Sequence, residues 1–239
     1  MTELGLRRYV AGRGVRLRLA HPTRNAVTTM TRLVDLSDPI HVAADGSSAA
    51  RLRHVDISTE GDRYMARVYD FAHDGMCGTY IDLPGHVVET DDGADAASVS
   101  LERLFRLAAG IVRLDLPDRA GAVTAEMLTS AYRGPDRPAA LAINALGARR
   151  YDAIEFRSVF LTLDAVDWVV ATGCRLLLSD IYESQGIHGV FPKLFSAGIS
   201  TVCQPVNLHL LEGDGCRVSV LFAPFAGVTQ LPCRAVAEI

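Results

Sequence analysis

Hydrophobic residues recur along the chain with two different spacings, which predict different elements. Helical spacing covers residues 163–172, and Gly173 follows as a C-terminal stop. Short apolar runs bounded by turn residues predict buried strands. We expect such strands at 33–40, 110–115, 139–146, 176–180, 199–202, 218–222 and 234–237. The first half is therefore rich in strands, and the second half alternates strands with helices.

The remaining pattern adds two strands and three short helices. The strands are expected at 51–58 and 64–71, and the helices at 100–109, 124–128 and 191–195. Ser100 and Thr124 stand where an N-cap is needed. Because the connections are short throughout, the order favours one mixed α/β domain over two domains. We divide the chain into an arginine-rich N-terminal extension, residues 1–27, and a catalytic domain, residues 28–239.

Composition and charge exclude several classes of protein. The 239 residues are 49% hydrophobic and 22% charged, with a net charge of -4, so nothing points to nucleic acid or an anionic membrane as partner. The arginines of residues 1–27 lack interleaved aromatics, which favours a solvated or interface role. No apolar run approaches the roughly 20 residues of a membrane helix, and no signal peptide is evident. The five cysteines form no CxxC pair, which indicates free thiols and a cytoplasmic location.

Residues 76–86 pack chemically active side chains more densely than any other segment. Their sequence is Met-Cys-Gly-Thr-Tyr-Ile-Asp-Leu-Pro-Gly-His. If the segment is an extended strand, Tyr80, Asp82 and His86 lie on one face, about 7 Å apart at each two-residue step. A buried row of a phenol, a carboxylate and an imidazole is costly without partners or a ligand. We therefore predict that this row is the active site.

The same segment resembles the signature of the cyclase family, whose best-known members are bacterial kynurenine formamidases. The family motif runs His-x-x-x-His-x-Asp-x-Pro-x-His, commonly with Gly-Thr before its second histidine. The matching positions here are Met76, Tyr80, Asp82, Pro84 and His86, with Gly78 and Thr79 as the Gly-Thr pair. Further similarity lies at 34–37, 165–168, 173, 179–180 and 231–237. The resemblance implies the family's swivelling β/β/α fold and a homodimer or larger homo-oligomer.

The departures from the family pattern concern its metal site. In the family, the first two motif histidines and the aspartate hold a divalent metal, and the last histidine is the general acid or base. Only Asp82 remains of those three ligands, because Met76 and Tyr80 replace the histidines, and both are poor ligands for such metals. A later histidine and glutamate of the family align with Phe191 and Cys203, and the nearby His188 is a candidate replacement for that histidine. We therefore expect no metal and no other cofactor.

Each candidate residue has a functional and a structural interpretation. His86 suits proton transfer near neutral pH, or is a structural histidine bonded to backbone. Asp82 orients His86 or is itself a base, or is a carboxylate satisfied by backbone N–H groups. Tyr80 can donate a hydrogen bond to a developing oxyanion. We expect the substrate-binding residues to be His188, Glu183, Thr79 and Phe191. Cys77 falls on the opposite face, which disfavours a nucleophile there.

The sequence thus predicts a metal-independent acid/base enzyme that acts on a small organic molecule. The reaction would be ring closure, dehydration, isomerisation or hydrolysis of an activated amide or lactone, in specialised biosynthesis. Three alternatives stay open. The chain could be a non-catalytic ligand-binding relative or a metal-dependent amide hydrolase with atypical ligands, or Asp82, His86 and His188 could bind iron.

Overall fold

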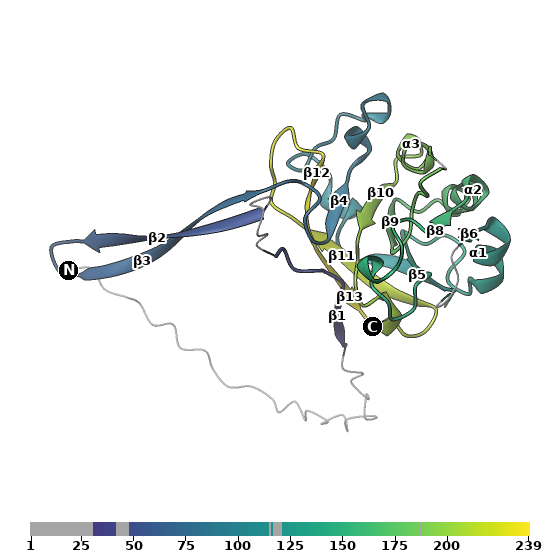
Figure 1. Ribbon diagram of the computed structural model, residues 1–239, viewed down its shortest axis with the longest axis horizontal. Coiled ribbons are helices and arrows are strands. Elements are labelled where there is room, and N and C mark those ends of the chain that lie inside the picture. The colour runs from purple at the N-terminus through teal and green to yellow at the C-terminus, as the bar shows by residue number, and fades with distance from the viewer. Residues whose placement is uncertain (1–30, 42–47, 115, 117–120, 187) are drawn as a thin grey trace, which may run out of the picture. The chain divides into compact units, whose positions relative to one another are not determined.

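A nine-stranded mixed sheet organises the chain (Figure 1). The computed structural model describes residues 31–41, 48–114, 116, 121–186 and 188–239, so the predicted extension at 1–27 lies outside the described residues. The strand order is β1-β13-β11-β5-β7-β9-β10-β4-β12. In chain order these strands are β1 (Leu33–Asp35), β4 (Tyr80–Asp82), β5 (Leu107–Arg113), β7 (Ala140–Asn144), β9 (Leu176–Ser179), β10 (Ser200–Cys203), β11 (Gly215–Leu221), β12 (Gln230–Pro232) and β13 (Arg234–Glu238).

Four neighbouring strands of the sheet, β5, β7, β9 and β10, run parallel. Strands β7 and β9 are buried along their whole length, as expected for apolar runs covered on both faces. One face packs against α1 (Ala125–Ala131), α2 (Leu163–Thr172) and α3 (Val190–Ser196), which are drawn together beside the sheet in Figure 1. The other face buries a second cluster that includes Ile81 and Val202. The chain is thus a mixed α/β fold with apolar layers on both sides of its sheet.

The helix predicted at 163–172 has those bounds in the structure. Thr162 caps its first turn, and Gly173 ends it with φ of 74°, a left-handed conformation that glycine adopts without strain. Thr124 likewise caps α1, as predicted. The strand predictions that start at Leu33, Leu176 and Arg234 are also confirmed, each ending one to five residues earlier or later than expected.

The helix predicted at 100–109 is wrong. Only the 3₁₀ turn Leu101–Arg103 forms there, and β5 begins at Leu107. Leu107 pairs with Val218 of β11 and is buried, so sheet pairing determines the conformation in place of the local helical spacing.

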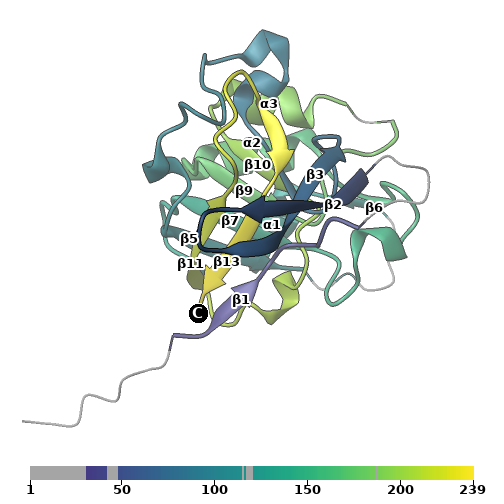
Figure 2. The same ribbon diagram turned by 90° about the vertical axis from the view of Figure 1, so that its left-hand side faces the viewer.

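Two smaller sheets accompany the large one. Strands β6 (Gly121–Val123) and β8 (Val159–Leu161) pair in parallel. Strands β2 (Ser48–Ser58) and β3 (Arg63–His73) form an antiparallel hairpin, a separate two-stranded ribbon in Figures 1 and 2. The strands predicted at 51–58 and 64–71 are therefore present. No helix in the described ranges combines the length and apolar character that crossing a bilayer would require.

Candidate active site

The densest segment of the sequence folds around a very short strand. Only Tyr80–Asp82 is extended, so the prediction of one continuous strand over 76–86 is wrong. Gly78 adopts φ of 62°, and a Cβ at this position would lie 2.6 Å from the Asp38 carbonyl oxygen, so the close approach requires glycine. Pro84 opens a 3₁₀ turn, Pro84–His86, immediately after the strand. The alternation of side chains along a strand therefore puts Tyr80 and Asp82 on one face, but it does not determine where the His86 side chain lies.

Strand β4 is paired on both sides, which surrounds its polar side chains with those of β10 and β12. Tyr80 lies opposite Cys203, and Asp82 lies opposite Thr201 of β10 and Gln230 of β12. Ile81 points to the opposite, apolar face and is fully buried. The pairing thus places a phenol, a thiol, a carboxylate and an amide on one face of the sheet.

Gln230 connects the carboxylate to the imidazole. Its Nε2 donates to Asp82 Oδ1 over 2.8 Å and lies 3.1 Å from His86 Nε2. Because this amide nitrogen can only donate, His86 Nε2 is the acceptor, and the proton of a neutral His86 is on Nδ1. The His86 ring also meets the edge of Phe195, with ring centroids 6.5 Å apart. His86 is therefore joined to Asp82 through one intervening side chain.

The electrostatics of this group favour its neutral forms. Burial raises the pKa of Asp82 above its usual value, although the Gln230 hydrogen bond, the nearby His86 and the Cys203 hydrogen bond act in the opposite direction. Burial, followed by the charges of Cys203 and Asp82, also raises the pKa of Tyr80. Burial and the Asp82 charge raise the pKa of Cys203, whose Sγ donates to Asp82 Oδ2 over 3.6 Å. Cys203 is therefore a thiol donor and a poor nucleophile.

Tyr80 and Cys203 line a cavity of about 150 Å³, which we call the Tyr80 cavity. Its walls are strongly aromatic, and the rings of Tyr182 and Phe191 stack there at 5.1 Å. Glu183 and Arg157 bring opposite charges, with Arg157 Nη1 3.7 Å from Glu183 Oε2. The cavity therefore combines flat apolar walls with a small set of polar groups, as binding sites for small molecules do.

The structure brings together only some of the predicted site residues. Tyr80, Glu183 and Phe191 line the Tyr80 cavity, and Asp82 lies behind Cys203. Two other predicted binding residues, Thr79 and His188, do not line it. The buried Thr79 hydroxyl accepts from the Asp38 amide over 2.7 Å and donates to the Gln204 carbonyl over 2.8 Å, so it connects two loops. His188 is exposed.

The residues of the family's metal motif do not fit a divalent ion here. Tyr80 carries a neutral phenol, Asp82 is engaged by Gln230 and Cys203, and Met76 is a half-exposed thioether. The alternative with Asp82, His86 and His188 as ligands is wrong, because no three His, Cys, Asp or Glu side chains within the described ranges gather around one point. Cys77 lies before the strand and its thiol donates to the Asp74 carbonyl.

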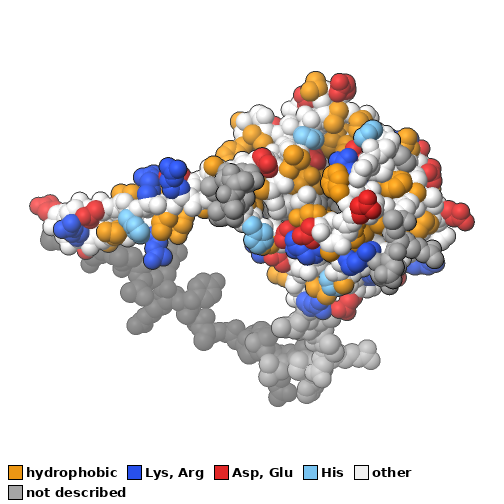
Figure 3. Space-filling model, in the orientation of Figure 1, with side chains coloured by type: hydrophobic (Ala, Val, Ile, Leu, Met, Phe, Trp, Pro, Cys, Tyr) orange, Lys and Arg blue, Asp and Glu red, His pale blue; other side chains and the backbone are white. Residues whose placement is uncertain are grey.

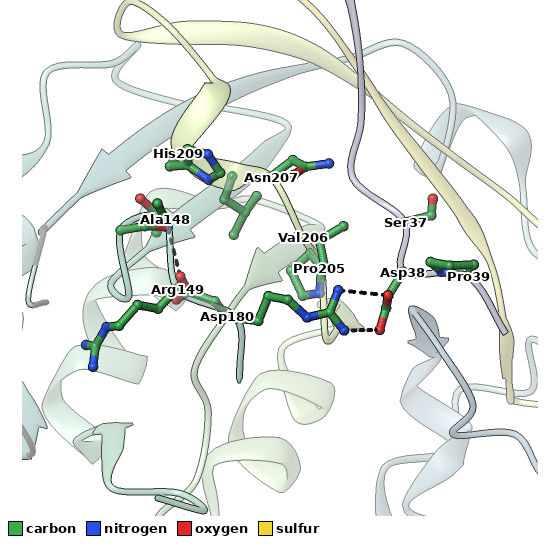
Figure 4. Close-up of a pocket in the computed structure, with 14 residues that line it drawn as sticks. Ser37, Asp38, Pro39, Ala148, Arg149, Asp180, Pro205, Val206, Asn207 and His209 are labelled. Atoms are coloured by element: carbon green, nitrogen blue, oxygen red, sulfur yellow. Dashed lines mark hydrogen bonds and ion pairs between the residues drawn. The ribbon is translucent and has the colours of Figure 1, made fainter. Parts of the chain in front are cut away.

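A second cavity, of about 240 Å³, opens beyond the carboxyl ends of β7, β9 and β10 (Figure 4). Asp38 faces it and receives two hydrogen bonds from Arg150, of 3.0 and 2.8 Å, and one of 3.1 Å from the Tyr151 hydroxyl. Burial raises the pKa of Asp38, but Arg150 and Tyr151 lower it below its usual value overall. Asp180 lines both cavities, and burial raises its pKa to about 6. The hydrogen bond to Asp38 holds the Tyr151 side chain, which forms part of the wall of the Tyr80 cavity.

Two functional candidates were missed by the sequence analysis. Gln230 belongs to β12, a strand of three residues without a distinct apolar pattern. Arg157 follows Phe156 in a turn with φ of 56°, and its guanidinium lies 5.0 Å from the Phe156 ring centroid. Neither residue belongs to a motif, so only pairing across the sheet and loop geometry identify them.

Comparison with known proteins agrees with this fold and motif. The Cyclase family model, described as "Putative cyclase", matches residues 17–184, and the chain therefore belongs to the cyclase family. Membership places it among enzymes of cyclase type that act on small molecules.

Solved structures of low sequence identity share the fold. "The Structure Of Potential Metal-Dependent Hydrolase With Cyclase Activity" is 18% identical with a TM-score of 0.65, covering 87% of this chain and 98% of the other. Isatin hydrolase A from Labrenzia aggregata, bound to benzyl benzoate, is 16% identical with a TM-score of 0.61, covering 87% and 94%. "The structure of predicted metal-dependent hydrolase from Bacillus stearothermophilus" is 18% identical with a TM-score of 0.62, covering 87% and 98%. The search of curated proteins returns no significant match.

Proposed function

We propose that the chain is an acid/base enzyme that works without a metal ion on a small organic molecule bound in the Tyr80 cavity. The observation that carries the proposal is the hydrogen-bonded series from Asp82 through Gln230 to His86, of 2.8 and 3.1 Å, beside a cavity lined by Tyr80. Its two ends are a buried carboxylate, which makes no ion pair with a lysine or arginine among the described residues, and an exposed imidazole. Carboxylates and imidazoles are the side chains that most often serve as general acids and bases.

The three side chains have different tasks in this proposal. Tyr80 keeps its proton because its pKa is raised, so it can donate a hydrogen bond to a substrate oxygen that becomes negative. Asp82, whose pKa is also raised, accepts a proton from the substrate side after Cys203 moves aside. His86, at the exposed end, exchanges its own proton with solvent; the Gln230 amide nitrogen donates to Asp82 and to His86, so it orients both groups and carries no proton between them. Gln230 is a positioning residue, because it acts through Asp82 and His86.

The proposed reactions are those that do not need a metal-bound hydroxide: ring closure, dehydration, isomerisation, or hydrolysis of an activated amide or lactone. A cavity of about 150 Å³ limits the enclosed part of the substrate to a small group, and the Tyr182–Phe191 stack favours a flat one. Isatin hydrolases share the fold, so isatin is a reasonable first probe. We further propose a role in specialised biosynthesis and a cytoplasmic location.

The test uses purified full-length protein, assayed before and after treatment with a chelator, against isatin and a panel of activated esters, amides and lactones. We expect turnover that survives the chelator and falls by about 10²–10⁴-fold in His86→Ala. His209→Ala replaces an exposed histidine that, unlike His86, is not hydrogen-bonded to Gln230, and should keep wild-type turnover.

Other outcomes favour the alternatives. One tightly bound zinc or manganese per chain, with activity lost on chelation, would show a metal-dependent hydrolase with ligands of a new kind. Tight binding of a probe without turnover, unchanged by His86→Ala, would show a ligand-binding relative.

A further inference from the structure

Arg157 is a charged residue of the Tyr80 cavity with unused hydrogen-bonding capacity. Its guanidinium lies 3.7 Å from Glu183 Oε2 and 5.0 Å from the Phe156 ring centroid, and it makes no hydrogen bond with any residue that the structure describes. A guanidinium has five N–H donors, so several remain for a ligand. The Arg157 side chain is 38% exposed, and a molecule that enters the cavity can therefore reach it.

The two acidic residues of the same cavity are held by other partners. Asp180 accepts hydrogen bonds from the backbone amides of Ala145 and Leu146, at 2.9 and 3.1 Å. Glu183 accepts one from the Gly189 amide over 3.1 Å, and its side chain is only 12% exposed. Among the described residues that line the cavity, the guanidinium is therefore the charged group most free to meet a ligand.

The backbone at this cavity is unusual in a way that is typical of binding sites. Arg157 has φ of 56°, and Gln204, another residue of the cavity wall, has φ of 54°. In the described ranges only two further residues other than glycine, Arg106 and Asn207, have positive φ. Left-handed conformations are costly for such residues and concentrate at functional sites. The strain at Arg157 thus favours a role in binding.

Recognition of an anion at this cavity has to be local. The protein carries a net charge of -4, and acidic and basic side chains are interspersed on the face drawn in Figure 3. A general positive field therefore does not concentrate anions. Burial raises the pKa of Tyr80 most strongly, and the charge of Arg157 acts in the opposite direction. The guanidinium and the phenol are therefore close enough to act on one bound molecule.

We propose that Arg157 makes the Tyr80 cavity selective for flat molecules that carry one carboxylate, which names the substrate class of the proposed function and rests on it for the reaction. The planar guanidinium donates two parallel hydrogen bonds to a carboxylate. The stacked rings of Tyr182 and Phe191 take the flat part, and Tyr80 donates to another oxygen of the same molecule. The neighbouring Glu183 carboxylate repels a dianion, so a phosphate group is disfavoured.

The test measures binding without turnover, by fluorine NMR titration of the full-length protein. The probes are para-fluorobenzoate and its neutral isostere para-fluorobenzamide, at about pH 7.5, where the acid is ionised. We expect the acid to bind at least ~10-fold more tightly than the amide, because hydrogen bonds between charged groups are the stronger ones. Arg157→Gln should weaken binding of the acid by at least ~10-fold and change binding of the amide by less than ~2-fold.

Arg106→Gln is the matched control. Arg106 also has positive φ, of 50°, but it pairs with Glu238 and does not line the cavity. The variant should bind both probes as the wild-type protein does. Circular dichroism of each variant verifies that the fold is kept.

Equal binding of the two probes, binding of neither, or a preference for the acid that survives Arg157→Gln overturns the inference. His86→Ala separates this inference from the proposed function, because it should lose turnover and keep the preference for the acid. A preference for the acid in a protein without turnover would refute the enzyme but keep the carboxylate site. Metal-independent turnover of neutral substrates, without a preference for the acid, would do the reverse.

Discussion

Two buried carboxylates, Asp82 in β4 and Asp38 in the segment that follows β1, occupy opposite electrostatic environments. Asp38 receives two hydrogen bonds from a guanidinium and one from a phenol, and its pKa is lowered. Asp82 receives one from an amide and one from a thiol, and its pKa is raised. An aspartate side chain is therefore held charged at position 38, whereas at position 82 its protonated form is favoured. The comparison separates a carboxylate that braces the structure from one that can exchange a proton.

The largest expected effect distinguishes the two carboxylates by activity. Asp82→Asn keeps the shape of the side chain but removes its basicity, so turnover should fall by about 10²–10⁴-fold with the fold intact. Asp38→Asn should destabilise the protein but leave kcat within a few-fold, as measured on the folded fraction. If Asp38→Asn reduced kcat as strongly as Asp82→Asn, the separation of roles would be wrong.

The second prediction concerns the stability that the Asp38–Arg150 ion pair contributes. Arg150→Met leaves the buried Asp38 carboxylate without its cation, and we expect a loss of about 2 kcal/mol in the free energy of unfolding. The value is below that of a fully buried pair because the Arg150 side chain is 44% exposed. Arg53→Met breaks the exposed Arg53–Asp70 pair and should change stability by less than about 0.5 kcal/mol. Urea unfolding of both variants measures the difference, and equal losses would contradict it.

The sequence predicted the central strands and helices well because their signals are local. Leu176–Ser179 is an apolar run between turn residues, and Leu163–Thr172 has helical spacing and a glycine stop. The contacts of the candidate site were harder to predict from the sequence. Gln230 reaches Asp82 across 148 positions, in a strand too short to have a pattern. Pro84–His86 forms a turn where alternation predicted a strand, so contact between His86 and Asp82 depends on an intermediary that no motif identifies.

The smallest expected effect is a difference in how stability depends on pH. The pKa of Asp82 is raised in the folded state, so the folded protein binds more protons there than the unfolded chain does. Its contribution to stability is present below the unfolded pKa of about 4 and is lost as pH rises through the folded pKa. Asp38 has the opposite sign: its contribution is present above about pH 4 and is lost as pH falls through its lowered folded pKa.

Relative to Asp82→Asn, the wild-type protein should therefore lose stability as the pH rises from about 4 towards neutrality. Relative to Asp38→Asn, it should lose stability as the pH falls below about 4. Asp180, whose pKa is raised to about 6, is present in all three proteins, so its effect cancels in these differences. Urea unfolding of the three proteins across this pH range measures both slopes. Two slopes of the same sign would mean that Asp82 is held charged as Asp38 is, and that its contacts with Gln230 and Cys203 brace the sheet rather than hold a carboxylate that exchanges a proton.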